Sequence, residues 1–118
     1  MLVPGDNGLT YRMYYCSARR DLELPADGAR PASLGEILEM MDRVLSAPGG
    51  FLGVIDEAGG ILQFLVADDG VVAVEIPDPE RRGHYGKPST LTDCKQILGD
   101  ASGSFHWQKF DGLAFEKW

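Results

Sequence analysis

The 118-residue chain has few cysteines, few histidines and few basic residues. Its two cysteines, Cys16 and Cys94, are far apart, which gives neither a disulfide framework nor the paired spacing of a zinc site. The remaining groups suited to acid–base chemistry include His84 and His106, and no motif joins a histidine to a cysteine. We therefore expect no metal and no cofactor, and we expect both thiols to be buried as small apolar side chains.

Basic side chains are outnumbered, with 11 Lys and Arg against 18 Asp and Glu and a formal net charge of −7. The arginine pairs at 19–20 and 81–82 are each flanked by acidic residues. Nucleic-acid binding needs a basic face, so this balance argues against a nucleic-acid partner. An acidic surface can simply be well solvated, or it can attract a basic protein partner. Charge alone leaves both interpretations open.

Long apolar runs are also missing. Residues 1–8 lack the basic start and apolar stretch of a secretory signal, and no run is long enough to span a membrane. We therefore expect no membrane association and a cytoplasmic location. The length predicts one domain over residues 1–118, with residues 1–9, rich in Gly, Asp and Asn, as a flexible start.

Two helices are predicted. Ser33 and Glu36 form a Ser-x-x-Glu capping box, which is followed by apolar residues at helical spacing and then by Pro48. This pattern predicts a helix over about 34–46. A second helix is expected to begin near Thr90 or Leu91.

Strands are predicted at 11–16, 51–56, 61–67 and 71–76, with short final strands at 105–107 and 113–115. Glycine-containing connectors separate the three central runs, so these form an antiparallel meander. Residues 21–32 and 77–90 are expected to be loops because they contain several Pro and Gly residues. The predicted fold class is α+β: an antiparallel sheet, made of the central meander with N- and C-terminal strands, packed by two helices.

A register for the meander follows if the loops are 57–60 and 68–70. It places Ile55 opposite Leu62, Phe64 opposite Val74, and Gln63 opposite Glu75. The helix-covered face then holds these residues: Phe51, Ile55, Leu62, Phe64, Val66, Val72, Val74 and Ile76. The other face is mixed, and its apolar members are Leu52, Val54, Ile61, Leu65 and Val71.

Motifs for catalysis are weak. A Cys94/His106 pair has no motif to support it, and the run Asp68-Asp69-Gly70 fits a hairpin turn better than a calcium loop. We therefore expect the domain not to be an enzyme. The polar loop predicted at 77–90 joins the strand that carries Glu75, and such a loop is either a recognition surface or simply mobile. The residues predicted to bind a partner are Asp56, Gln63, Glu75, Asp78, Glu80, His84 and Tyr85.

The order of motifs resembles a known class of proteins. A capped helix precedes Phe-Leu-Gly-Val-Ile-Asp (51–56), Gly-Gly-Ile-Leu-Gln-Phe (59–64) and Val-Val-Ala-Val-Glu-Ile-Pro (71–77), followed by Gly-His-Tyr, a helix and Phe-His-Trp. Over roughly residues 33–110 this is similar to the small α+β immunity proteins of bacterial polymorphic toxin systems. The resemblance implies that the chain neutralises a cognate, basic, cytoplasmic-acting toxin, of the nuclease or nucleic-acid deaminase type, by covering its active site.

Two other interpretations stay open. The face with Gln63 and Glu75 could form part of a pocket for a small molecule, in a binding or minor enzymatic domain. Alternatively, the apolar side chains of the same mixed face could join copies of the chain in a homo-oligomer.

Overall fold

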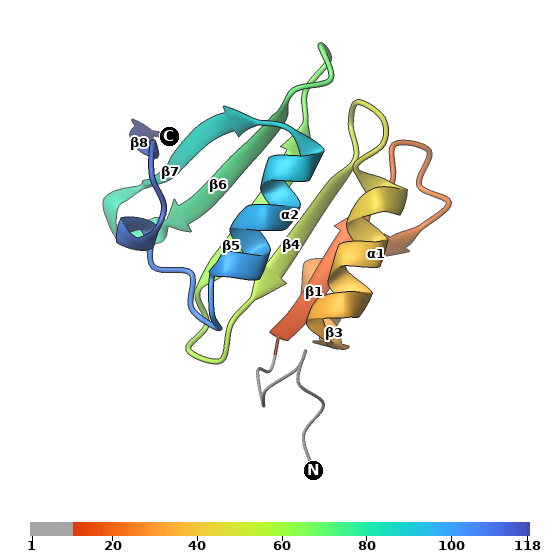
Figure 1. Cartoon of the computed structure of the whole chain (residues 1–118), viewed down its shortest axis with the longest axis horizontal. Coiled ribbons are helices and arrows are strands. Elements are labelled where there is room, and N and C mark those ends of the chain that lie inside the picture. The colour runs from red at the N-terminus through yellow and green to blue at the C-terminus, as the bar shows by residue number, and fades with distance from the viewer. Residues whose placement is uncertain (1–10) are drawn as a thin grey trace.

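The computed structural model describes residues 11–118, so the start expected to be flexible, 1–9, lies outside the described residues. The described chain forms an antiparallel sheet in the order β2-β1-β4-β5-β6-β7-β8, with β3 also paired to β1 (Figure 1). The strands are β1 (Tyr11–Cys16), β2 (Glu23–Leu24), β3 (Arg30–Ala32), β4 (Phe51–Ile55), β5 (Ile61–Val66), β6 (Val72–Asp78), β7 (Gly83–Ser89) and β8 (Ala114–Lys117). The α-helices are α1 (Leu34–Val44) and α2 (Leu91–Asp100), and short 3-10 turns are η1 (Ala26–Gly28), η2 (Pro79–Arg81) and η3 (Trp107–Lys109).

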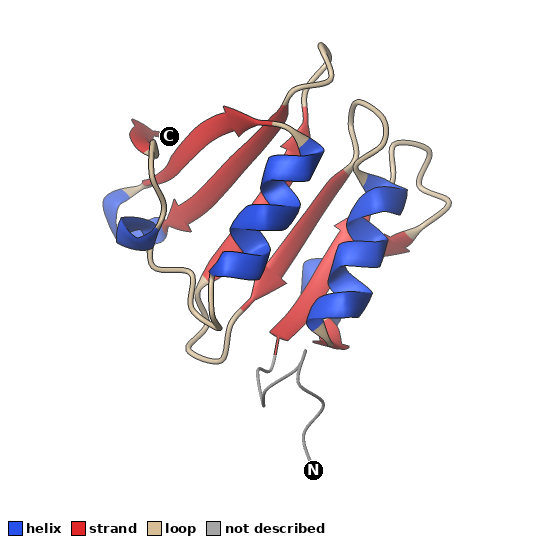
Figure 2. Cartoon of the chain, in the orientation of Figure 1, coloured by secondary structure: helices blue, strands red, loops and turns tan. Residues whose placement is uncertain are grey.

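Both α-helices pack on one face of the sheet, side by side (Figure 2). The α1 helix begins as predicted, because Ser33 Oγ accepts from the amide of Glu36 and the Glu36 carboxylate accepts from the amide of Ser33. Hydrogen bonding of the carboxylate to Ser33, mainly to its backbone amide, lowers the pKa of the Glu36 carboxyl. Thr90 caps α2 in a similar way through its hydroxyl and the amide of Asp93. The predicted α+β fold class is confirmed.

One continuous apolar core lies between the sheet and the two helices. The helices contribute Ile37, Met41 and Val44 from α1 and Cys94 and Leu98 from α2. The sheet contributes every second residue along its strands. Among these core residues are Met13, Leu52, Val54, Leu62, Phe64, Val74 and Tyr85. Since both helices cover the same face, the side chains between these positions point to the opposite face of the sheet.

The predicted register between the first two strands of the meander is wrong by one residue. Val54, not Ile55, lies opposite Leu62, and Leu52 lies opposite Phe64. Consequently Leu52 and Val54 belong to the core, whereas Phe51 and Ile55 face the other side. The cause is Asp56, which begins the turn instead of ending the strand. The Asp56 carboxylate accepts from the amides of Ala58 and Gly60 at 2.9 and 2.7 Å.

The register between β5 and β6 is as predicted. Phe64 lies opposite Val74, and Gln63 lies opposite Glu75. The predicted loop at 77–90, in contrast, is wrong: residues 83–89 form β7, which pairs with β6 along its whole length. Pro88 made this segment resemble a loop, but it lies on the part of β7 that β8 does not reach.

Other boundaries also differ from the prediction. The segment 21–32 is not entirely loop, because β2 and β3 both pair with β1. No strand forms at 105–107, where the described chain instead enters the 3-10 turn η3. The final strand is present and runs from Ala114 to Lys117, slightly later than expected. Short segments of this kind depend on a neighbouring strand for their conformation, so local sequence pattern predicts them poorly.

Replacing Asp56 by Asn should destabilise the fold strongly. Asp56 is buried, and its second oxygen, Oδ2, accepts from the amide of Phe105 at 2.9 Å. An asparagine NH₂ would face an N–H donor in either orientation, so we expect D56N to lower the free energy of unfolding by about 2–3 kcal/mol. Urea unfolding measures this effect. The control is D69N, because exposed Asp69 accepts only one amide bond, from Val71, and Asn can do the same. Equal stability of the two variants would contradict the role of Asp56.

Candidate functional site: the open face of the sheet

The candidate site is the sheet face turned away from α1 and α2, which we call the open face. One straight row of cross-strand neighbours runs across it, with one residue from each of five strands. This row consists of Tyr14, Gly53, Gln63, Glu75 and Gly86. Because neighbours in register lie close enough for their side chains to touch, polar groups along the row can bond to one another.

The polar side chains of the open face form a continuous chain of contacts. The Tyr14 hydroxyl donates to Gln63 Oε1 at 3.0 Å, and Gln63 Nε2 donates to Glu75 Oε1 at 3.0 Å. The other Glu75 oxygen, Oε2, lies 3.3 Å from His84 Nε2. Finally, Trp118 Nε1 donates to His84 Nδ1 at 3.0 Å. We call these five residues, Tyr14, Gln63, Glu75, His84 and Trp118, the polar row.

Two glycines make room for the rings of the polar row. A Cβ atom added to Gly53 would overlap the Tyr14 ring, so this ring lies directly over the Gly53 backbone. A Cβ atom added to Gly86 would lie 3.2 Å from His84 Cδ2. Glycine inside a strand often marks such a close approach. Both rings can therefore reach across the sheet toward their polar partners.

The contacts of His84 determine where its proton lies. An indole N–H can only donate, so Nδ1 of His84 must be an acceptor and carry no proton. Neutral His84 therefore has its proton on Nε2, which faces the Glu75 carboxylate. The more exposed carboxylate of Glu116 approaches the same nitrogen, with Oε2 at 3.8 Å.

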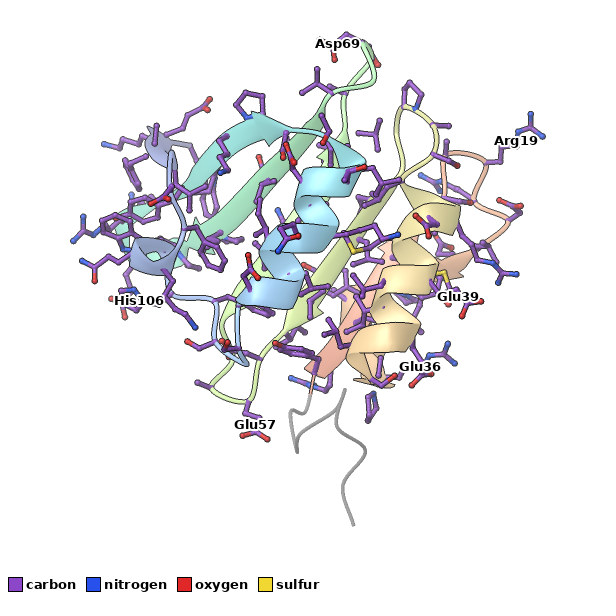
Figure 3. The ribbon with its side chains drawn as sticks, in the orientation of Figure 1. Arg19, Glu36, Glu39, Glu57, Asp69 and His106 are labelled. Carbon is purple, nitrogen blue, oxygen red and sulfur yellow. The ribbon has the colours of Figure 1, made fainter. Side chains whose placement is uncertain are left out.

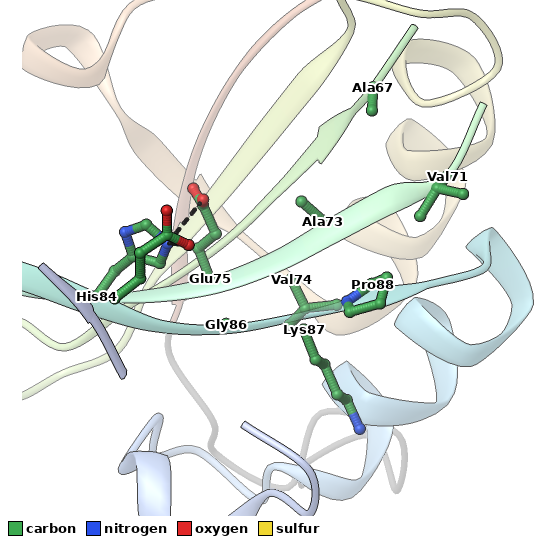
Figure 4. A pocket seen from close by; sticks show the side chains of 10 residues that line it. Ala67, Val71, Ala73, Val74, Glu75, His84, Gly86, Lys87 and Pro88 are labelled. Atoms are coloured by element: carbon green, nitrogen blue, oxygen red, sulfur yellow. Dashed lines mark ion pairs between the residues drawn. The ribbon is translucent and has the colours of Figure 1, made fainter. Parts of the chain in front are cut away.

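Two shallow hollows, each of about 250 Å³, flank Glu75 on the open face. The first contains Glu75, His84 and Glu116 together with small apolar residues of β6 and β7 (Figure 4). The second is lined by Phe51, Phe64 and Leu65 with Gln63 and Glu75. Apolar side chains are exposed beside the polar row, with Leu65 42% and Val71 37% accessible. The open face thus combines a polar centre with apolar surroundings, as protein-binding surfaces do.

Three of the predicted partner-binding residues, Gln63, Glu75 and His84, are brought together in the polar row. Asp78 and Glu80 lie instead at the β6–β7 turn. There Asp78 caps η2 by accepting from the amide of Arg81, and Glu80 is exposed. These two acidic residues are thus at the end of the sheet, outside the polar row.

The expected positions of Asp56 and Tyr85 are wrong. Asp56 is buried in the β4–β5 turn, and Tyr85 is buried on the helix-covered face with its ring stacked on Trp107 at 4.3 Å. Strand alternation in β7 explains the position of Tyr85, because His84 and Tyr85 are consecutive and their side chains must point to opposite faces of the sheet. Treating the segment as a loop concealed that alternation.

Sequence reasoning missed Tyr14, Glu116 and Trp118. Tyr14 had a detectable signal, because strand alternation separates it from the core residues Met13 and Tyr15. Glu116 and Trp118 had none, since their positions depend on β8 pairing with β7, an element of four residues. Charged side chains elsewhere, such as Glu39 on α1 and Glu57 in the β4–β5 turn, point outward from the molecule (Figure 3).

The two thiols are placed as expected, in buried positions. Burial raises the pKa of the Cys94 thiol to about 11 and also raises the pKa of Cys16. His106 is exposed, and its Nδ1 accepts from the amide of Gln108. Within residues 11–118, no three His, Cys, Asp or Glu side chains are grouped as a metal site would require.

In this same part of the chain, no helix combines the length and apolarity needed to cross a membrane. Comparison of the chain with protein-family models, curated proteins and solved structures gives no significant match. Function must therefore be inferred from the open face itself.

The thiols should react slowly in the folded protein. Because only the thiolate reacts, a pKa of about 11 leaves Cys94 almost wholly protonated at neutral pH. We expect C16S, which retains Cys94, to react with Ellman's reagent more slowly than C94S, which retains Cys16. Both variants should react fast and equally once unfolded in guanidinium. Rapid labelling of Cys94 in the folded state would restore it as a candidate nucleophile.

The proton of neutral His84 should be found on Nε2. Long-range ¹⁵N–¹H spectra distinguish the two imidazole nitrogens, and we expect Nδ1 to have the shift of an unprotonated nitrogen. In W118F the indole donor is lost, so the signal of Nδ1 should move and the two tautomers should mix. A proton on Nδ1 in the unaltered protein would contradict the Trp118 contact.

Proposed function

We propose that this protein is a non-catalytic binding domain whose open face contacts another protein. The observation that supports this most directly is the polar row, which lies on an open sheet face beside exposed apolar side chains. Interfaces commonly have this composition, in which aromatic and apolar groups surround a few well-placed polar groups.

The partner we propose is a basic protein. A net charge of −7 favours encounter with a positively charged surface, and the carboxylates of Glu75 and Glu116 meet on the open face. Together with the resemblance to immunity proteins, this supports the role of a cytoplasmic inhibitor that binds and blocks a cognate toxin, of the nuclease or nucleic-acid deaminase type.

A small-molecule site is the less favoured function. Each hollow of about 250 Å³ lies just below the range of about 300–1,000 Å³ that is usual for ligand pockets. The carboxylate of Glu75 accepts from Gln63 and lies 3.3 Å from His84 Nε2, within a shallow surface. A wide contact with a protein suits such a surface better than enclosure of a small molecule.

The first experiment is capture of the tagged chain from its native host, followed by identification of co-purifying proteins. We expect one basic protein in a one-to-one complex, with an association rate that falls as salt rises. A chain that emerges without a partner and as a monomer would contradict the proposal. A stable dimer without a partner would favour self-association through the open face.

Leu65→Arg should weaken this complex. Leu65 is exposed on the open face, and an arginine there would repel a basic partner. We expect a loss of affinity of about tenfold or more, which corresponds to about 1.4 kcal/mol. Ala58→Arg is the matched control, because it adds the same charge at the exposed β4–β5 turn. Isothermal titration with the captured partner measures both, and equal affinities would place the interface elsewhere.

A further inference from the structure

The first hollow has two chemically different ends. One end is apolar and is formed by Val71, Ala73 and Pro88. The other end contains Glu75 and Glu116, whose carboxylates both approach His84 Nε2. Figure 4 shows Glu75 and His84 side by side at this end. A ligand that fits this hollow must therefore have an apolar part joined to a positively charged group.

The negative charge at the second end has no full cationic partner among residues 11–118. The ion pairs that Glu75 and Glu116 make within the described chain are with His84 alone. An imidazole can carry at most one positive charge, and Nδ1 of His84 accepts from the indole N–H of Trp118. Two carboxylates therefore share a single imidazole, which cannot balance both of their charges.

Lys87 also lines the hollow, but it does not neutralise these carboxylates. Its ammonium group donates to the carbonyl of Asp111 at 2.7 Å. The Lys87 side chain points away from Glu75 and His84 (Figure 4). A cation that pairs with Glu75 and Glu116 is thus left for a binding partner to supply.

Arginine fits this arrangement better than lysine. A planar guanidinium has several N–H donors in a fixed geometry, so one group can bond to both carboxylates, whereas an ammonium is a point charge. The flat group can also stack on aromatic rings, and the polar row offers the His84 imidazole and the exposed Trp118 indole. The arginine stem would cover the small apolar side chains of the hollow.

We propose that this hollow binds an arginine side chain of the partner protein, with the guanidinium between Glu75 and Glu116 and the aliphatic stem over Ala73 and Pro88. The proposal rests on the proposed function in that a protein partner supplies the arginine. It adds the particular side chain that the acidic domain recognises and the residues that recognise it.

The test uses N-acetyl-arginine N-methylamide as a probe of the full ¹⁵N-labelled chain. The citrulline analogue, which has nearly the same shape and no charge, is the control ligand, and the lysine analogue tests the choice of cation. We expect saturable shifts of the Trp118 indole and Gln63 amide signals with the arginine probe. The lysine analogue should bind more weakly, and the citrulline analogue should produce no saturable shift.

Variants identify the residues responsible. Glu75→Gln and Glu116→Gln should each weaken the arginine probe, by about tenfold for Glu75, since a charge-assisted bond is lost. Glu116 is highly exposed, so its replacement leaves folding intact and keeps the test valid if E75Q is unstable. Glu57→Gln removes the same charge at an exposed turn and should bind the probe like the unaltered chain.

The outcomes separate this inference from the proposed function. Equal binding of the citrulline analogue, or unchanged binding by both E75Q and E116Q, would overturn the arginine site. If the captured partner still bound both variants normally, the protein-binding function would stand without this site. If the probe bound as expected but the native host yielded no partner, the arginine site would stand and the proposed function would fail.

Discussion

The Asp56 carboxylate is the contact on which the arrangement of the open face depends. It accepts three backbone amides, two inside the β4–β5 turn and one from Phe105, more than forty residues along the chain. By taking Asp56 out of the strand, these bonds place Gly53 opposite Gln63. A slip by one residue would bring Val54 to that position and turn every β4 side chain over. The Tyr14 ring could then no longer lie over a glycine backbone, and the polar row would lose its first member.

The rings of the polar row lie against two glycines inside the strands, and a glycine inside a strand by itself destabilises a sheet. Glycine within a strand has a conformational cost of roughly 0.5–1 kcal/mol relative to alanine. Gly53 and Gly86 occupy such positions. The Tyr14 ring over Gly53 donates to Gln63, and the His84 ring beside Gly86 places Nε2 3.3 Å from Glu75. Glu75 is the shared acceptor, with one oxygen toward Gln63 and the other toward His84. The row holds its carboxylate at a defined place on the surface, which a mobile surface glutamate could not do.

Sequence pattern predicted the elements whose signals are local, and it failed where distant contacts decide. The capping residues Ser33 and Thr90 identified both helices, and the alternation in β5 and β6 correctly placed Gln63 opposite Glu75. The error in β4 arose because a residue following an apolar run can equally end a strand or begin a turn. Three amide bonds to Asp56 favour the turn, and one of them comes from distant Phe105. β7 was mistaken for a loop because its glycines and proline are explained only by neighbours: His84 over Gly86, and the limited reach of β8 beside Pro88. The position of Trp118 had no local signal at all.

An open sheet face must avoid indiscriminate association while still accepting one partner, and the polar row meets both requirements. Exposed Leu65 and Val71 alone would favour contact with any apolar surface. A partly buried carboxylate at the centre opposes this, because covering Glu75 with an apolar surface would remove its remaining water without giving it a cation. A partner that inserts a guanidinium compensates for this loss and gains the apolar contact as well. Discrimination then comes from the cost imposed on unmatched surfaces as much as from attraction to the matched one. The same carboxylates also work against self-association, since a second copy would bring an equally acidic face to the contact.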